Sequence, residues 1–424
     1  MQLKSLLLSA VAIASVFAAD DDDKTTTKTT SKATSTATTS TSRKDPCSFS
    51  TAITEPTGIA ELNACATLKG EITISGNAIG PIDLPSVREL AGSLTIVNSP
   101  SIVSVSLNSL QNITGSLQIK NATQLHSIDV ISLERVKELQ FISLPSLSNF
   151  NFNPSIKEVE KIVLSDTALF DLSGLTQFKE INYMNLNNNK NITTIDFPNL
   201  KTVTDTLILS FNHDDAQVSM NKLIWAANLT IQDVKKFSAT NLTAVNGTLG
   251  FSYNTYEELK LDKLENVGQS LQIFANDDLD RLSLKKLTEI GGELKMFNNT
   301  ELENMTYSFP ELKRVRGALS ITGDFEDLSM PSLERVQGDF KMTSKSEDFK
   351  CDKYDELKDK GRIEGHNYQC ASGKKENLSG KVDDDEEDDD NNNESGPRTS
   401  SPNKESSGNT QYVPILMLLT FLFC

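Results

Sequence analysis

The central part of the chain repeats a short alternation of apolar and polar residues at a nearly constant interval. In the stretch GQSLQIFANDDLDRLSLKKLTEIGGELKMFNN, residues 268–299, a Gly, an alternating apolar run and an Asn occur twice. Alternation with a period of two predicts a β-strand in each run. Thirteen runs follow one another at intervals of 20 to 25 residues, and their first apolar residues, here called anchors, are Ile72, Leu94, Leu117, Leu139, Ile162, Met184, Leu207, Leu229, Leu249, Leu271, Leu294, Leu319 and Phe340.

Other apolar positions keep fixed offsets from the anchors. Apolar pairs precede many anchors by seven and four residues, as Val87 and Leu90 precede Leu94, and a further apolar residue follows two positions later. A repeat of this length is too short for a strand, a full helix and their turns, and it cannot bury its apolar face alone. We therefore expect an all-β-dominated fold, a right-handed parallel β-solenoid of about thirteen stacked coils over residues 72–345.

Asparagine recurs just after the anchors, where each coil is expected to turn. Stacked at one corner, such side chains can hydrogen-bond the backbone of successive coils. The residues lie five positions past the anchor, or four in the cases of Asn98 and Asn121, and they are Asn77, Asn98, Asn121, Asn189, Asn212, Asn254, Asn276 and Asn299.

Four cysteines flank the repeats in two pairs of similar spacing. Cys47 and Cys65 are 18 residues apart, and Cys351 and Cys370 are 19 apart. In an oxidising compartment these pairs predict two local disulfides, within an N-terminal cap at 45–71 and a C-terminal cap at 346–372. The stretch CDKYDELKDKG predicts a short helix ending at Gly361. Zinc is the competing interpretation, but the spacing contains no CxxC, so no metal site is expected.

Both ends of the chain are typical of processing and anchoring signals. A charged head followed by the apolar run Leu6 to Phe17 indicates a secretory signal peptide. The thirteen residues from Tyr412, apolar apart from Thr420, are fewer than the roughly 20 that a membrane-spanning helix needs, and small residues precede them, which predicts a glycolipid (GPI) anchor signal. The attachment candidates are Ser406, Ser407 and Gly408, with Ser400 or Ser401 as upstream alternatives because the spacer is short. The expected segments are a signal peptide at 1–18, a Ser/Thr-rich disordered arm at 19–44, an acidic and Asn/Ser-rich disordered linker at 373–408 and a removed tail at 409–424.

Ten N-x-S/T sequons lie behind the signal peptide and predict a heavily glycosylated surface. Their acceptors are Asn112, Asn121, Asn191, Asn228, Asn241, Asn246, Asn298, Asn304, Asn377 and Asn393.

Catalytic chemistry finds little support in the sequence. The three histidines, His126, His213 and His366, belong to no nucleophile or metalloprotease motif, and no phosphate-binding Gly loop is present, so we expect neither an enzyme nor a cofactor. A glycosidase needs only two carboxylates, however, which keeps a wall-polysaccharide hydrolase or transglycosylase open as an alternative. The net charge of −17 disfavours nucleic acid as a partner.

Specific stretches of the repeats carry a family resemblance. The segments LIWAANLTIQDV, NVGQSLQIFANDDL and EIGGELKMFNNTEL, together with both Cys pairs and both terminal signals, resemble the fungal GPI-anchored cell-wall organisation proteins of the sporulation-specific family. The resemblance implies a receptor L-domain-like fold with leucine-rich-type repeats. It also implies a surface glycoprotein that supports wall organisation and integrity as a non-catalytic scaffold or binding protein.

The same resemblance implies a location on the outer face of the plasma membrane, held by the glycolipid anchor, or in the cell wall. Wall glucan or a mannoprotein are the implied partners, and the oligomeric state stays open. A receptor-like ligand binder is a further alternative, suggested by the L-domain likeness. Members of the family usually have a Ser/Thr-rich stalk, whereas this chain has DDDEEDDD at 383–390, which leaves retention at the membrane or transfer to the wall open.

Overall fold

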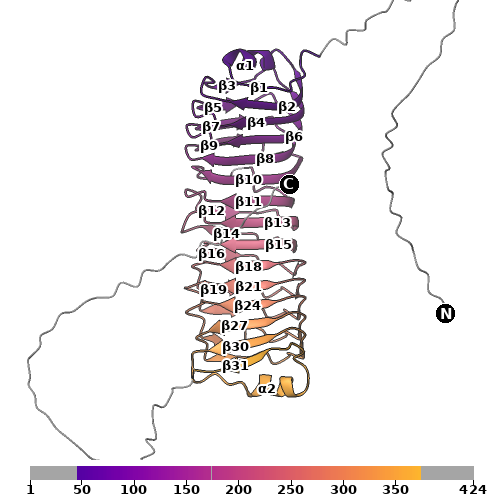
Figure 1. Ribbon diagram of the computed structural model, residues 1–424, viewed down its shortest axis with the longest axis vertical. Coiled ribbons are helices and arrows are strands. Elements are labelled where there is room, and N and C mark those ends of the chain that lie inside the picture. The colour runs from indigo at the N-terminus through magenta and orange to yellow at the C-terminus, as the bar shows by residue number, and fades with distance from the viewer. Residues whose placement is uncertain (1–44, 173, 374–424) are drawn as a thin grey trace, which may run out of the picture. The chain divides into compact units, whose positions relative to one another are not determined.

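A computed structural model describes residues 45–172 and 174–373 of the chain, and these residues form one stack of coils (Figure 1). Each coil places one segment in a wide sheet and most place a shorter strand in a narrow sheet, with the core between the two. The predicted signal peptide, the Ser/Thr-rich arm, nearly all of the linker and the tail lie outside the described residues. So do Asn377, Asn393, Ser406, Ser407 and Gly408.

The wide sheet contains twenty strands, and the pairs recorded between them are parallel. Its strands are long in the first coils, and from β17 onward most coils contribute two short strands separated by a bulge. The members are β1 (Ala52–Ile53), β2 (Thr67–Ser75), β4 (Glu89–Val97), β6 (Asn112–Lys120), β8 (Arg135–Leu144), β10 (Glu158–Thr167), β11 (Glu180–Asn187), β13 (Thr202–Ser210), β15 (Trp225–Gln232), β17 (Ala244–Val245), β18 (Leu249–Ser252), β20 (Asn266–Val267), β21 (Leu271–Phe274), β23 (Glu289–Ile290), β24 (Leu294–Phe297), β26 (Arg314–Val315), β27 (Leu319–Gly323), β29 (Arg335–Val336), β30 (Phe340–Ser344) and β31 (Tyr368–Ala371).

The narrow side is divided into four separate sheets of two to four strands. The first contains β3 (Ile82–Asp83), β5 (Ser104–Ser106), β7 (Ser127–Val130) and β9 (Asn149–Phe152), and the second contains β12 (Thr194–Asp196), β14 (Gln217–Ser219) and β16 (Lys236–Ser238). The third pairs β19 (Glu258–Lys260) with β22 (Arg281–Ser283), and the fourth pairs β25 (Asn304–Met305) with β28 (Asp327–Leu328).

The register of the wide sheet confirms the repeat deduced from the sequence. Every anchor pairs with the anchor of the next coil, from Ile72 opposite Leu94 through to Leu319 opposite Phe340. All thirteen anchors are buried. Because side chains alternate along a strand, residues at equal offsets from the anchors form continuous columns along the stack. The predicted parallel β-solenoid of about thirteen coils is therefore confirmed.

Glycines at the bulge before the anchor let successive coils approach closely. A Cβ added to Gly268 would lie 2.0 Å from the carbonyl oxygen of Asn246, and one added to Gly291 would lie 2.1 Å from the carbonyl oxygen of Gly268. Backbone cannot move aside as a flexible side chain can, so only glycine fits at these two positions.

Two successive positions at the corner after each anchor differ in backbone conformation and in burial. The residue four past the anchor has a left-handed backbone with φ between 51° and 59° in ten coils, and it is Asn98, Asn121, Ser143, Asp166, Asn188, Phe211, Asp233, Tyr253, Ala275 or Asn298. The following residue points inward. Asn98 and Asn121 therefore occupy the exposed left-handed position, where the Nδ2 of Asn121 donates to the Oδ1 of Asn98, and Asn77 is also exposed. Asn98 and Asn121 thus stack at the corner as predicted, but in the exposed position and through their side chains.

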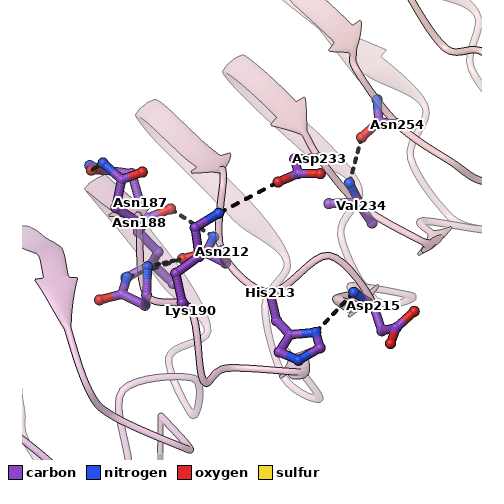
Figure 2. A network of polar contacts seen from close by, with 11 residues as sticks. Asn187, Asn188, Lys190, Asn212, His213, Asp215, Asp233, Val234 and Asn254 are labelled. Atoms are coloured by element: carbon purple, nitrogen blue, oxygen red, sulfur yellow. Dashed lines mark hydrogen bonds and ion pairs between the residues drawn. The ribbon is translucent and has the colours of Figure 1, made fainter.

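The other five asparagines form the predicted ladder. These five residues are buried, and they are Asn189, Asn212, Asn254, Asn276 and Asn299. Where two of them lie in adjacent coils, the Oδ1 of the later residue accepts hydrogen bonds from both the backbone N–H and the Nδ2 of the earlier residue. Their own Nδ2 groups also donate to backbone carbonyls of earlier coils. Val234 interrupts the ladder between Asn212 and Asn254, and its backbone N–H donates to the Oδ1 of Asn254 (Figure 2).

A cap closes each end of the stack, and each contains one of the predicted disulfides, Cys47–Cys65 and Cys351–Cys370. At the C-terminal end helix α2 (Asp352–Asp359) is followed by Gly361 at φ 66°, close to the predicted helix end. The N-terminal helix α1 (Pro56–Asn63) and the strand pairings of β1 and β31 with the terminal coils were not predicted. Neither helix is long and apolar enough to span a membrane, within the described part of the chain.

Candidate functional site

The outward side chains of the wide sheet form a long surface, which we call the outer face. It consists of the residues one before, one after and three after each anchor, because the anchors and the residues two past them point into the core. In the columns one and three past the anchors no residue is Asp or Glu, and the charged members are Lys120, Lys295 and Lys341. This composition is unusual for a chain with 58 acidic residues.

Five consecutive coils in the middle of the stack contribute no charged residue to the outer face. These coils have the anchors from Met184 to Leu271, and we call their outward residues the neutral patch. It consists of hydroxyl, amide, aromatic and small side chains, of which Ser210, Gly250 and Ser252 are buried by their neighbours. The members are Tyr183, Asn185, Asn187, Thr206, Ile208, Ser210, Asn228, Thr230, Gln232, Thr248, Gly250, Ser252, Ser270, Gln272 and Phe274. Contacts within the patch fix the orientation of some amides: the Nδ2 of Asn187 donates to the Oδ1 of Asn185 at 2.9 Å, and the Nε2 of Gln232 donates to the Oγ of Ser252 at 2.8 Å.

Aromatic rings line one edge of the neutral patch, where the coils turn their corner. Phe274 and Phe297 are stacked with centroids 4.8 Å apart and an interplanar angle of 3°, and Tyr253 meets Phe274 edge-on at 5.8 Å. Phe211 lies 6.1 Å from Tyr253. Tyr253 is 52% exposed and Phe211 is 40% exposed, so these rings present apolar surface to solvent. We call Phe211, Tyr253, Phe274 and Phe297 the aromatic row.

A partly buried carboxylate lies within this row. Asp233 has the same left-handed corner position in its coil as Phe211 and Tyr253 have in the coils on either side. Burial raises the pKa of the Asp233 carboxyl, and the nearby Asp214 raises it further, while Lys190, whose Nζ lies 4.0 Å from the Oδ2 of Asp233, opposes the shift (Figure 2). In the adjoining turn the Nδ1 of His213 accepts from the backbone N–H of Asp215 at 2.9 Å, which makes it a local turn contact.

A cavity of about 730 Å³ lies on the narrow side, between two sheets. It is lined by residues of β12, β14 and β16 and by residues at the start of the next sheet, including Phe237, Tyr256, Glu258 and Arg281. In this region β16 and β19 belong to different sheets, so the strand pairing of the narrow side is interrupted. The lining mixes lysines, an arginine and carboxylates, and Asp233 is not part of it.

The chemistry expected from the sequence can now be located. The adjacent acidic residues Asp277 and Asp278 are exposed turn residues, and Asp278 lies 3.8 Å from the Nζ of Lys235. No group of three or more metal-ligating side chains occurs within residues 45–172 and 174–373. The four cysteines all form disulfides within the end caps.

Eight of the ten predicted glycan acceptors fall within the described residues, and their occupancy stays a prediction. Asn121 and Asn298 have the left-handed corner position, Asn304 begins β25, Asn112 begins β6, and Asn191, Asn241 and Asn246 lie between strands. Asn228 lies in β15, where its amide contacts the backbone of both neighbouring coils. None of the eight occupies the columns one or three residues past an anchor.

The aromatic row was not predicted from the sequence, in which Trp225 is the single tryptophan. Trp225 is half-buried at the start of β15. A signal did exist: Phe274 and Phe297 are 23 residues apart, which is the local repeat interval, and each lies three residues past its anchor. Equal offsets in adjacent coils place two side chains next to each other, so the stacking could have been predicted from the repeat.

Comparison with known proteins gives the family. The chain is 48% identical to the cell surface GPI-anchored protein ECM33 of Candida albicans over 90% of this chain and 87% of that protein. It is 37% identical to the cell wall mannoprotein PST1 of Saccharomyces cerevisiae over 73% of this chain and 68% of that protein, and 30% identical to the sporulation-specific protein 2 of the same yeast over 76% and 64%. No family model matches, and no solved structure matches. The extent of these similarities shows that the chain belongs to the family of fungal GPI-anchored cell-surface and cell-wall proteins.

Proposed function

We propose that this chain is a GPI-anchored surface glycoprotein that supports cell-wall organisation as a non-catalytic scaffold or binding protein. The observation that carries the proposal is the similarity to ECM33, which extends through all of the repeats and covers 90% of the chain. The regular stack of coils adds a physical reason, because repeat proteins present long continuous surfaces that suit binding and spacing. The anchor would hold this surface outside the plasma membrane, with attachment at Ser406, Ser407 or Gly408.

The anchoring part of the proposal is tested by deleting residues 412–424. We expect the truncated chain to be secreted into the medium, and a phosphatidylinositol-specific phospholipase to release the intact chain from cells. Function is then measured in cells that lack their own copy of the protein, as the ability to grow in the presence of wall-binding dyes. Full restoration by the truncated chain would contradict a need for anchoring, and detergent-only extraction of the intact chain after phospholipase treatment would contradict the anchor itself.

A wall-polysaccharide hydrolase is the second candidate, and one observation favours it. A glycosidase needs a carboxyl group with a raised pKa as its general acid and a second carboxylate nearby. Burial raises the pKa of Asp233, and Asp214 is close enough to contribute to that shift. Incubation of the purified chain with wall glucans and chitin tests this directly. New reducing ends that disappear in an Asp233→Asn variant would establish the hydrolase and overturn the non-catalytic proposal.

A further inference from the structure

We propose that the neutral patch and the aromatic row together bind a linear, uncharged polysaccharide whose chain runs along the stack, across the strands. This inference rests on the proposed role in the cell wall and assigns the binding to a defined face. The patch covers the coils with anchors from Met184 to Leu271, and the row adds Phe297 of the following coil.

The absence of charge within the patch favours an uncharged partner, and the one carboxylate in the row, Asp233, lies 4.0 Å from the Nζ of Lys190. Nucleic acids and anionic lipid surfaces are bound through clusters of Lys and Arg, and the fifteen residues of the patch include neither. Hydroxyl and amide side chains both donate and accept hydrogen bonds, as sugar hydroxyls do. The patch therefore matches an uncharged polymer rich in hydroxyl groups.

The aromatic row supplies the apolar part of the site. A pyranose ring exposes C–H groups on its faces, and these pack against aromatic rings. Tyr253 combines an exposed ring with a hydroxyl that can reach a neighbouring sugar oxygen, the combination that makes tyrosine frequent in binding surfaces. Because Phe274 and Phe297 stack face to face, each ring covers one face of the other, and the pair meets a ligand in a fixed orientation, so less side-chain freedom is lost on binding.

The spacing of the coils fits a repeating ligand. Strands in a sheet lie about 4.8 Å apart, which is close to the length of one sugar unit in an extended β-1,4-linked chain such as chitin. Successive sugars would then meet equivalent columns in successive coils. Each contact can be weak, since a polymer that engages several coils at once gains from the linkage between its units.

Gly250 leaves room for a Cβ within the patch. It lies one residue past the anchor Leu249, opposite Thr230 in one neighbouring coil and Gln272 in the other, and its backbone is not left-handed. A Cβ placed on Gly250 would meet only the Oγ1 of Thr230, at 4.0 Å. A larger residue can therefore be introduced here without displacing the backbone, which allows the face to be altered while the coil stays folded.

Co-sedimentation of the secreted chain lacking residues 412–424 tests the proposal. The probes are insoluble β-1,3-glucan and chitin, with alginate gel as a charged control. We expect the wild-type chain to sediment with one or both uncharged polymers and to stay in solution with alginate. Gly250→Glu and the double variant Tyr253→Ala/Phe274→Ala should each weaken binding roughly tenfold or more, a loss equal to that of one good contact.

Two control variants distinguish binding at this site from nonspecific adsorption through exposed aromatic residues. Phe170 and Tyr307 are exposed aromatic residues outside the patch and the row, at 65% and 77% exposure. Phe170→Ala and Tyr307→Ala should bind as the wild-type chain does, and circular dichroism should show that all variants are folded. Equal binding by wild-type, Gly250→Glu and the double variant would overturn the proposal.

The chain's own glycans are the rival occupants, because the acceptor Asn228 belongs to the patch and the acceptor Asn298 directly follows Phe297. Equal binding by the wild-type, Asn228→Gln and Asn298→Gln proteins supports the proposal, and binding that appears only in one of the two variants would overturn it by showing that a glycan covers the site. The role in the wall is scored separately, by the dye resistance of cells. A wild-type chain that restores resistance but sediments with neither polymer would refute the assigned face and leave the wall role standing.

Discussion

Removal of one buried amide from the asparagine ladder should destabilise the solenoid strongly. The side chain of Asn276 is completely buried and takes part in four hydrogen bonds. Its Nδ2 donates to the carbonyl oxygen of Phe251 at 3.2 Å and to the Oδ1 of Asn299 at 2.9 Å. Its Oδ1 accepts from the backbone N–H of Asn254 at 3.1 Å and from the Nδ2 of Asn254 at 2.8 Å. An Asn276→Ala substitution removes all four.

The expected loss follows from the groups that remain without these partners. The Nδ2 of Asn254 still donates to the carbonyl of Ile231, and the Oδ1 of Asn299 still accepts from the backbone of residue 276. The backbone N–H of Asn254 loses its ladder partner in the core, and an unpaired buried polar group costs about 1–3 kcal/mol. The carbonyl of Phe251 lies in the paired strand β18 and loses only its additional contact with the amide. The free energy of unfolding should therefore fall by about 2–3 kcal/mol, from one such group near the middle of that range and a small cavity in addition.

Urea unfolding of the secreted chain, followed by circular dichroism, measures this loss. The control is Asn77→Ala, since Asn77 has the same offset from its anchor but is exposed, and its substitution should change stability by less than about 0.5 kcal/mol. Hydrogen exchange should show faster opening in β18, β21 and β24 than in β4 and β6, because repeat proteins transmit a defect mainly to neighbouring coils. A loss below about 1 kcal/mol in Asn276→Ala would refute the argument that the ladder stabilises these corners through its hydrogen bonds.

Three further predictions concern the caps, the charge pairs and the bulge glycines. Cys351→Ser should lower the stability of the C-terminal cap by about 2–5 kcal/mol and leave one titratable thiol, and an unchanged thiol count would contradict the Cys351–Cys370 bond. Hydrogen bonds from Arg316 and Arg314 lower the pKa of Glu289, so its ionised form stabilises the folded chain above its ordinary value of 4.5, and this contribution is lost as the pH falls through the lowered value. Glu289→Gln should thus reduce the melting temperature at pH 7 but hardly at pH 3, and an equal reduction at both would exclude the ionic explanation. Gly291→Ala should destabilise by about 1–3 kcal/mol because the new Cβ meets the carbonyl of Gly268, whereas Gly250→Ala should be close to neutral, and equal melting temperatures for the two variants would contradict the steric argument.

Much of this architecture could be predicted because each coil encodes its own strand. The alternation around an anchor such as Leu271 is local, and the constant interval between anchors determines which residues pair. The disulfides could be predicted for the same reason, since each closes a short loop next to the repeats. Helix α1 and the pairing of β31 with β30 could not, because the caps do not repeat and their conformations depend on contacts with a single terminal coil.

The surface features depend on relations between coils, which a single repeat does not reveal. Asn98 and Asn121 differ by one position from the ladder asparagines, and this single step changes the residue from buried to exposed. The neutral patch emerges only when five coils are aligned and their outward residues are compared. The break between β16 and β19 accompanies the shortest interval between anchors, the 20 residues from Leu229 to Leu249, and nothing in the local pattern of either strand indicates it.

The end caps also prevent the addition of strands from other molecules to the two ends of the stack. Each coil of the wide sheet accepts a parallel strand on both sides, and the last repeat strand, β30, would offer the same edge to another molecule if β31 were missing. β1 covers the edge of β2 at the opposite end in the same way. A chain stripped of both caps would present two complementary edges with the same register, and its copies could join head to tail into a growing fibre. The two disulfide-bonded caps therefore block an end-to-end polymerisation that the repeat itself would permit.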